Sequence, residues 1–432
     1  MYRTIINDLV SWYNEPKRKI LNIKGAKGVG KTWTIRDFAT GFFDAQIYFD
    51  VPATKEIIPF LSDNSKYSTE ERIAGFDSYL ETIAPDFEPE KTLIIFDELQ
   101  NISNCAYFFY SYAKKHRSYN LCMISSSMEI SEYEYHYVDV FRILRMRPMS
   151  FEEYMIASKS NPLITAIENH KSIPLNPVEV RSIRNLLREY LLVGGMPGVV
   201  CEFLKKKDYD VIRPMQQQIL DDYDALIKRS FSYAHAERCR RVWRSVPKQL
   251  THENKKFMYR FVDENARARE YEEAIQDLLN LGLIRKLPRI KSADLPLENN
   301  IDMKSFEIFC IDHGLLRSIY NLPVSRELTL EDIFNECSGG VAEQYVFEEL
   351  SAKVGYLYYW VSGATARVPF VYESAQGAIP VDLRFVKNNK AQNVKTFCAK
   401  NPDTNITLKI SLEPIAINET TLNVPAYGLW NM

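Results

Sequence analysis

GAKGVGKT, at residues 25–32, satisfies the pattern G-x-x-x-x-G-K-[ST] and decides the fold of the first part of the chain. The mainly apolar residues 21–24 before it predict a short strand, and residues 34–39 after it predict the start of a helix. In this strand–loop–helix context, backbone N–H groups of a glycine-rich loop can surround a phosphate, and the positive end of the helix adds to the attraction. The sequence therefore predicts an α/β fold with a phosphate-binding loop at this place.

The residue types in the loop indicate ATP and Mg²⁺ as its ligands. Lys31 supplies a cation for the β- and γ-phosphates, and the hydroxyl of Thr32 is an expected Mg²⁺ ligand. The expected nucleotide-binding residues of the loop are Gly25, Ala26, Lys27, Gly28, Val29, Gly30, Lys31 and Thr32.

A pair of carboxylates, Asp97 and Glu98, follows the apolar run 93–96. Such a run predicts a buried parallel strand, and the C-terminal ends of these strands are where open α/β sheets bind ligands. Asp97 is therefore the expected second Mg²⁺ ligand, and Glu98 is expected to orient or deprotonate the attacking water. An Asp-Glu pair at a solvated strand end is the alternative, which the upstream phosphate loop disfavours.

A third candidate strand, residues 121–124, ends in a run of serines. Ser125 could sense the γ-phosphate from this position, as a third catalytic side chain. Serines are also ordinary turn formers at strand ends, and the sequence leaves both interpretations open.

Length and composition limit what the whole chain can be. Its 432 residues predict two to four domains, and a net charge of −2 provides no global field for nucleic acid or membrane. The 7 cysteines form no CxxC pair, which favours a reduced cytoplasmic protein and disfavours structural zinc. The chain starts without the pattern of a signal peptide, and no apolar run approaches the roughly 18 residues of a membrane span.

The pattern of elements changes along the chain. Helices alternate with apolar strands to about residue 147, and a mainly helical region follows, for which Ser150 and Glu153 predict a capping box. Residues 210–290 are charged and helical, with an apolar hairpin around 282–287 and a linker at 288–304. After about residue 335 the chain becomes rich in strand patterns.

Nine segments together resemble one family: bacterial and archaeal AAA-superfamily ATPases with a C-terminal domain of unknown function that has a restriction-endonuclease-like fold. They are GAKGVGKT at 25–32, DELQ at 97–100, PMSFEEYM at 148–155, VGGMPGVV at 193–200, SVPKQLTHENKKF at 245–257, ARAREYEEAI at 266–275, IDHGLL at 311–316, GGVAE at 339–343 and VPAY at 424–427. The resemblance implies a P-loop ATPase core at 1–147, a helical lid at 148–208, a winged-helix-like domain at 209–304 and a nuclease-like α+β domain at 305–432.

The resemblance also implies roles for residues outside the loop. Gly195 and Pro197 would contact the nucleotide, as a GxP motif does in related signal-transduction ATPases, although a simple Gly-Pro helix break is the alternative. Arg142 would be a charge-stabilising finger. We favour the alternative, in which Arg142 simply lies with Arg145 and Arg147 on a polar strand face.

Within the winged-helix-like segment, Arg241, Arg244 and Lys248 fall on one face of a predicted helix. Such a face can follow the phosphates of DNA, although charged helix faces are more often simply solvated. Pro247 could end the helix early and leave Lys248 just beyond it.

The C-terminal segment departs from the nuclease pattern that the resemblance implies. That pattern requires an early Glu, then an Asp, then (Asp/Glu)-x-Lys, because the acids hold Mg²⁺ and the lysine polarises water or phosphate. Glu343 and Asp382 fit the first and third positions, whereas Pro369 replaces the central acid and Arg384 replaces the lysine. We therefore expect a nuclease-like scaffold without nuclease activity.

The favoured function is Mg²⁺-dependent ATP binding and hydrolysis that drives conformational switching of the winged-helix and nuclease-like domains. The alternative is a nucleotide-gated binding or scaffold protein with negligible turnover, and an ATP-dependent nuclease is disfavoured at Pro369 and Arg384. Expected partners are ATP and ADP, DNA through the basic face, and an unidentified protein, with no membrane contact.

Overall fold

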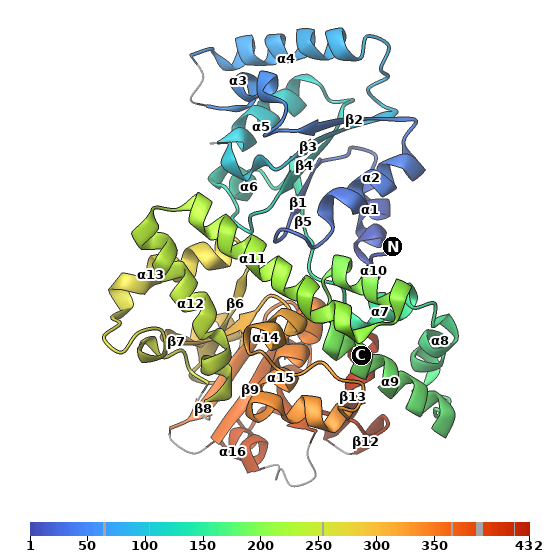
Figure 1. The fold of residues 1–432 in the computed structure, drawn as a ribbon, viewed down its shortest axis with the longest axis vertical. Helices are drawn as coiled ribbons and strands as arrows, with labels where there is room; N and C mark the ends of the chain where they lie inside the picture. Colours follow the sequence, from blue (N-terminus) through green and yellow to red (C-terminus); the bar gives the residue numbers. More distant parts are fainter. Residues whose placement is uncertain (64–65, 103, 253–254, 364–365, 386–391, 419) are drawn as a thin grey trace. The chain divides into compact units, whose positions relative to one another are not determined.

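The computed structural model describes residues 1–63, 66–102, 104–252, 255–363, 366–385, 392–418 and 420–432 (Figure 1). The chain divides into two compact units. Unit 1 comprises residues 1–147 and 280–282, and unit 2 comprises residues 148–279 and 283–432.

Unit 1 is built on a parallel sheet of five strands in the order β2-β3-β4-β1-β5. The strands are β1 (Ile20–Lys24), β2 (Ala45–Asp50), β3 (Thr92–Asp97), β4 (Asn120–Ser125) and β5 (Phe141–Arg145). β1 and β3 are buried along their whole length, as expected for strands covered on both faces. This sheet confirms the predicted parallel α/β fold.

Six helices accompany this sheet among the described residues. They are α1 (Ile5–Tyr13), α2 (Lys31–Phe42), α3 (Ile58–Leu61), α4 (Thr69–Ile83), α5 (Cys105–Lys115) and α6 (Glu132–His136). A cluster of fully buried aromatic rings, including Phe76 of α4, Phe96 of β3 and Phe108 of α5, joins two of these helices to the sheet. These contacts pack α4 and α5 against the sheet whose C-terminal edge carries Asp97.

Unit 2 begins with a series of helices. They are α7 (Phe151–Ala157), α8 (Asn161–Asn169), α9 (Pro177–Val193), α10 (Pro197–Lys206), α11 (Ile212–Ser230), α12 (Tyr233–Thr251) and α13 (Ala268–Asn280), followed later by α14 (His313–Ile319), α15 (Leu330–Lys353) and α16 (Gln392–Lys400). The capping box predicted for Ser150 and Glu153 starts α7 and is confirmed. The backbone of α15 leaves helical geometry at residues 336–339, so α15 is two helical pieces joined at a kink.

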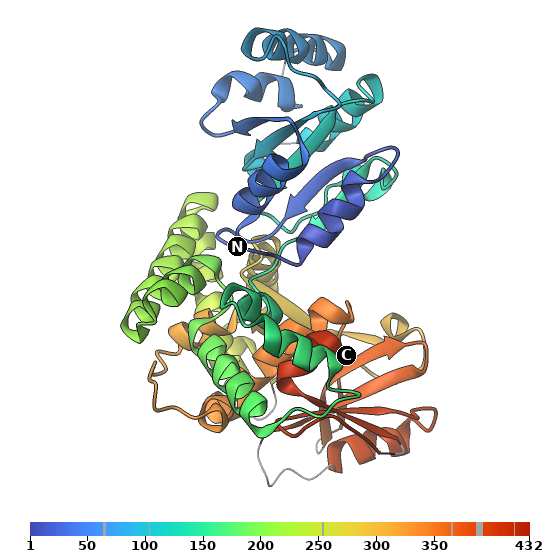
Figure 2. The same ribbon diagram turned by 90° about the vertical axis from the view of Figure 1, so that its right-hand side faces the viewer.

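The sheet of unit 2 has eight strands in the order β12-β13-β11-β10-β9-β8-β6-β7. The strands are β6 (Ile284–Ile290), β7 (Ile301–Cys310), β8 (Tyr358–Ser362), β9 (Ala366–Ser374), β10 (Gly377–Arg384), β11 (Thr407–Ser411), β12 (Ala416–Asn418) and β13 (Thr421–Pro425). β8, β9 and β10 form an antiparallel meander, and α16 connects β10 to the parallel strand β11. In Figure 2, α16 is the red-orange helix below this sheet. The ring centres of its Phe397 and of Trp360 on β8 lie 5.1 Å apart.

α12 continues through Pro247 to Thr251, so Lys248 lies on the helix with Arg241 and Arg244 as predicted, and Pro247 does not end the helix early. Val246, Pro247, Gln249 and Leu250 in its last turns are buried. One local prediction for unit 2 is wrong. The predicted linker 288–304 contains the end of β6 and the start of β7, which pair as an antiparallel hairpin. The hydrophobic residues of β6 are buried in the eight-stranded sheet, and the predicted domain boundary between residues 304 and 305 falls inside β7.

Candidate nucleotide-binding site

The loop between β1 and α2 has the conformation that its glycines allow. Gly28 and Gly30 have φ of 86° and 97°, the left-handed region that residues with a Cβ atom rarely adopt. A Cβ atom on Gly25 would lie 2.4 Å from the carbonyl oxygen of Met146, so the backbone approaches closely there. The glycines thus bring the chain from the end of β1 into the first turn of α2, where Lys31 and Thr32 lie.

Lys31 is buried at the mouth of this loop. Its ammonium donates to the carbonyl oxygens of Gly25 and Ala26, each at 2.9 Å, and to the hydroxyl oxygen of Ser126 at 3.1 Å. Burial lowers the pKa of Lys31 to about 8, although the nearby carboxylates of Glu98 and Asp97 oppose this shift. The cation therefore lies among oxygen acceptors in the loop that is expected to bind phosphate.

Thr32 and Asp97 meet as the two expected Mg²⁺ ligands should. The Thr32 hydroxyl donates to Oδ2 of Asp97, which also accepts a hydrogen bond of 3.0 Å from the hydroxyl of Tyr48. Asp97 is only 2% exposed at the end of β3. A hydroxyl and a carboxylate are hard oxygen donors, so their chemistry fits Mg²⁺.

Glu98 is fixed in place by its neighbours. Its backbone has φ of 61°, and its carboxylate accepts hydrogen bonds from the side-chain amide of Gln100 and, at 3.3 Å, from the hydroxyl of Ser126. Gln100 also accepts the backbone N–H of Ser126 at 3.0 Å. Ser126 therefore connects Lys31 to Glu98.

The serine in this network is one residue beyond the predicted one. Ser125 is the last residue of β4, and it pairs in register with Lys24 of β1. Among the described residues, the serine hydroxyl that contacts Lys31 and Glu98 is that of Ser126. The run of three serines was the sequence signal for this position, but periodicity could not show where β4 ends. Tyr48 had no such signal, and Gln100 was marked only as the last residue of the segment DELQ.

Arg142 does not reach this site. It lies on β5 and forms an ion pair with Glu15, and Asp8 is 4.0 Å away. All three residues belong to unit 1. This arrangement supports a strand-face role for Arg142, the alternative favoured from the sequence.

Gly195 and Pro197 have structural roles within unit 2. The N–H of Gly195 donates to Asp312 at 2.6 Å, and a Cβ atom on Gly195 would lie 2.3 Å from the carbonyl oxygen of Met149. Pro197 is the first residue of α10, a position whose backbone N–H makes no hydrogen bond within the helix, so proline breaks none. A nucleotide contact by these two residues stays a prediction.

The predicted basic face of α12 is partly neutralised. Arg241 pairs with Asp263 at 2.6 Å, and Arg244 lies 3.6 Å from Asp224. The ammonium of Lys248 lies 5.0 Å from the ring centre of Phe261. Both arginine side chains are more than half exposed. A ligand can therefore reach them by displacing these weak surface ion pairs.

The acids of the nuclease pattern pair with cationic side chains in this structure. Glu343 is bound by Arg367 and lies 2.8 Å from Lys255, whereas Asp382 pairs with Arg384 at 2.7 Å. Among the described residues, two groups have metal-ligand spacing: His235 with Cys239 and Asp277, and Asp312 with His313 and Glu348. Neither group includes Glu343 or Asp382.

Two family models match parts of the chain. Residues 17–155 match an AAA domain, and residues 184–326 match a domain of unknown function, DUF8612. The second match extends from α9 to the segment before α15, so it ends before most of the predicted nuclease-like segment. No curated protein matches the chain.

Solved structures of AAA-type proteins resemble the chain weakly. Caenorhabditis elegans PCH-2 is 12% identical over 43% of this chain and 53% of its own, with a TM-score of 0.28. The Saccharomyces cerevisiae Hsp104–ADP complex is 14% identical over 65% of this chain and 39% of its own, with a TM-score of 0.29. The Thermotoga maritima RuvB Holliday junction branch migration motor is 12% identical over 66% of this chain and 89% of its own, with a TM-score of 0.32. These scores lie below 0.5, so no function is inferred from them.

Residues 17–155 are similar to AAA P-loop ATPase domains. The family match and the five-stranded parallel sheet with its glycine loop support this conclusion together. Nucleotide binding is the property that this domain type implies. No helix among the described residues combines the length and apolar composition that a membrane span requires.

Proposed function

We propose that unit 1 binds and hydrolyses ATP with Mg²⁺, and that the nucleotide state sets the conformation of the rest of the chain. The observation that carries this proposal is the hydrogen bond between Thr32 of the glycine loop and Asp97 at the end of β3. It brings together the two oxygen side chains that would hold a Mg²⁺ ion.

The chain's own side chains suffice for the remaining steps. Lys31 exchanges its bonds to the carbonyls of Gly25 and Ala26 for phosphate oxygens. Thr32 and Asp97 would hold the Mg²⁺, which neutralises charge on the phosphates when bound. Glu98 orients a water for in-line attack on the γ-phosphate, and Ser126 and Gln100 hold the Glu98 carboxylate in position.

Unit 2 is the part that would respond. The order of α11, α12, α13 and the β6–β7 hairpin supports a winged-helix-like module, and the order α15, β8 to β10, α16, β11 supports a nuclease-like scaffold. In this proposal Gly195 and Pro197 contact the nucleotide. The hydrogen bond from the N–H of Gly195 to Asp312 then transmits the conformational change within unit 2. DNA contacts by Arg241, Arg244 and Lys248 would come from the winged-helix-like module.

The alternative is a protein that binds nucleotide but turns over negligibly. In that case the nucleotide would only gate the binding of a partner.

The decisive experiment measures phosphate release by the full chain with ATP and Mg²⁺, with EDTA, and with and without DNA. Multiple turnovers that stop in EDTA support the proposal, and stimulation by DNA identifies the class of partner. Tight ATP binding with less than one turnover in an hour would support the gated scaffold instead.

A further inference from the structure

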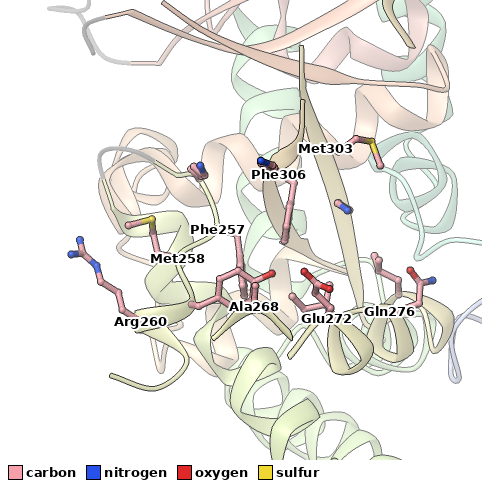
Figure 3. A pocket seen from close by; sticks show the side chains of 14 residues that line it. Phe257, Met258, Arg260, Ala268, Glu272, Gln276, Met303 and Phe306 are labelled. Carbon is pink, nitrogen blue, oxygen red and sulfur yellow. The ribbon is translucent and has the colours of Figure 1, made fainter. Parts of the chain in front are cut away.

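Unit 2 contains a cavity of about 630 Å³ between α13 and the β6–β7 hairpin. Figure 3 shows Glu272 and Gln276 of α13 on one side and Met303 and Phe306 of β7 on the other. The segment 256–260 closes a third side. The volume is in the range of sites that bind small ligands or single residues of a polymer.

The aromatic part of this cavity is preformed. The rings of Phe257 and Phe306 stack with centres 5.2 Å apart and planes 15° apart, and Tyr259 meets Phe257 edge-on at 5.0 Å. The N–H of Phe257 donates to the carbonyl of Phe306 at 2.7 Å, which ties the segment to the edge strand β7. Gln249 of α12 fixes the next residue, Met258, through bonds to both its N–H and its carbonyl.

The charged side chains around the cavity are mainly basic. Lys256, Arg260, Lys286 and Lys304 line it, against the single carboxylate of Glu272. Among the described residues, Arg260, Lys286 and Lys304 form no ion pair, in contrast to the arginines on α12. This local excess of positive charge occurs in a chain whose net charge is −2, so it attracts anions specifically to this place.

Lys286 shows the electrostatic character of the site most clearly. Its ammonium nitrogen lies 4.5 Å from the ring centre of Phe306, although the residue as a whole is exposed. Loss of hydration there lowers the pKa of Lys286, and Glu272 only partly opposes the shift. An anionic ligand would supply the close partner that this ammonium lacks.

We propose that this cavity binds a segment of single-stranded nucleic acid. Arg260, Lys286 and Lys304 contact its phosphates, and one unstacked base packs on Phe306 between Met258 and Met303. Lys286 moves from the ring to a phosphate as the base enters, which frees the face of Phe306. The inference does not depend on ATP hydrolysis, and its residues are distinct from the basic face of α12.

The combination of features selects this ligand over others. An acidic peptide would use the cations but not the stacked rings, whereas every base has a face that stacks on an aromatic side chain. In a duplex a base must first unpair and unstack before it can enter a concave site, so a single strand should bind more tightly. A free nucleotide has the same chemistry but spans only one of the phosphate contacts, so the strand should bind more tightly.

The test measures binding of a fluorescently labelled oligo(dT) strand to the full chain by anisotropy at several salt concentrations. The pocket variant is Arg260→Ala/Lys286→Ala/Lys304→Ala, and its matched control is Lys171→Ala/Arg181→Ala/Lys205→Ala, which also removes three positive charges from unit 2, all at exposed residues. A second pair introduces one negative charge at an exposed apolar residue: Met303→Glu in the pocket and Ile417→Glu on β12, where the native residues are 81% and 79% exposed.

We expect the pocket triple variant to bind at least tenfold more weakly and to lower the log–log salt slope by about 2, since each phosphate contact on a single strand contributes roughly 0.7. Met303→Glu should weaken binding at least threefold, and both controls should bind like the wild type. Because Met303 is exposed, its variant should fold normally even if the triple variant does not. Four outcomes would overturn the proposal: no strand binding by the wild type, a loss in the triple control as large as in the pocket variant, duplex bound as tightly as single strand, or thymidine monophosphate competing at the strand's own affinity.

Discussion

The guanidinium of Arg367 forms two parallel hydrogen bonds to the carboxylate of Glu343, from Nη1 to Oε1 at 3.0 Å and from Nη2 to Oε2 at 2.8 Å. The same guanidinium binds the fully buried Glu307 at 2.8 and 2.6 Å, and Lys255 adds a second cation to Glu343. Burial alone would raise the pKa of Glu343, but Arg367 and Lys255 outweigh it and lower the pKa to about 2. This carboxylate is ionised and already neutralised, so a metal ion would have to displace two fixed cations.

We therefore predict that the protein does not cut DNA with Mg²⁺ or Mn²⁺, with or without ATP. Pro369 supplies no oxygen ligand, and Arg384 stays protonated at any usable pH. The measurement is conversion of supercoiled plasmid on a gel. Cleavage that disappears in Glu343→Ala/Asp382→Ala would contradict the prediction and restore the nuclease hypothesis.

A second prediction concerns the stability of the same cluster. Arg367→Met leaves Glu307, which is 0% exposed, and Glu343 without their shared cation, so unfolding of unit 2 should become easier by about 3–5 kcal/mol. Arg384→Met breaks a single pair with the more exposed Asp382 and should cost about 1 kcal/mol or less. Guanidinium denaturation followed by tryptophan fluorescence gives both values. Equal costs would refute a special role for the Arg367 cluster.

Sequence reasoning succeeded where a pattern is local. The glycine loop, the strand before it and the carboxylates after β3 each follow from spacing and burial over a few residues, and the structure has these elements at the predicted places. The capping box at Ser150 is of the same kind. Such signals depend only on neighbours in the chain, so they can be recognised without tertiary information.

Contacts between distant segments could not be predicted in this way. Arg367 and Glu307 are 60 residues apart in the chain, and nothing in the local pattern of either marks the pair. The continuation of α12 through Pro247 is also a tertiary effect, since buried neighbours on both sides of the proline hold the helix. The local pattern also could not show which serine contacts Lys31 and Glu98, because the contacts of Ser126 are to residues 95 and 28 positions away in the chain.

The third prediction is a loss of stability of unit 2 between pH 6.5 and about 9. Burial would lower the pKa of His313, but hydrogen bonding and attraction to Glu348 outweigh it, and the pKa rises from 6.5 to about 9. Its Nδ1 lies 2.7 Å from Glu348 and its Nε2 lies 3.0 Å from the carbonyl of Tyr190, so both nitrogens must donate and the ring must be charged. Because the folded pKa lies above the unfolded one, this stabilisation is complete below pH 6.5 and is lost as the pH rises through about 9.

Glu349 also makes unit 2 less stable as the pH rises. Its burial raises its pKa to about 8, so the stabilisation from its neutral form is likewise lost as the pH rises through that value. Denaturation at pH 6.5 and at pH 9.5 should show the wild type losing roughly 3 kcal/mol for the histidine alone. The variant His313→Gln should show a smaller loss between the two pH values. An identical pH slope in the two proteins would exclude His313 as its source.

The fourth prediction separates phosphate binding from water activation. Lys31→Ala should abolish ATP binding, because it removes the buried cation of the loop. Glu98→Gln should retain ATP and lower the hydrolysis rate at least about 100-fold, since the amide cannot accept a proton from water. Binding is measured by fluorescence titration of a nucleotide analogue, and hydrolysis by phosphate release. Wild-type rates in Glu98→Gln would reject the proposed role of Glu98.

The fifth prediction tests which serine belongs to the site. The hydroxyl of Ser126 accepts from Lys31 at 3.1 Å and donates to Glu98 at 3.3 Å, so Ser126→Ala loosens both side chains without removing either. Because the role is one of positioning, we expect kcat to fall roughly tenfold with KM for ATP changed less than about threefold. Ser126→Thr, which keeps the hydroxyl, should recover most of the rate.

Ser125→Ala is the matched control, since it removes the same atom one residue earlier, at the end of β4. Its kcat should stay within about twofold of the wild type. If Ser125→Ala slows hydrolysis and Ser126→Ala does not, the network in this structure is not the catalytic one, and the position indicated by the sequence pattern is correct. If both variants hydrolyse ATP normally, Glu98 is positioned by Gln100 alone, and Gln100→Ala should then produce the tenfold loss in kcat.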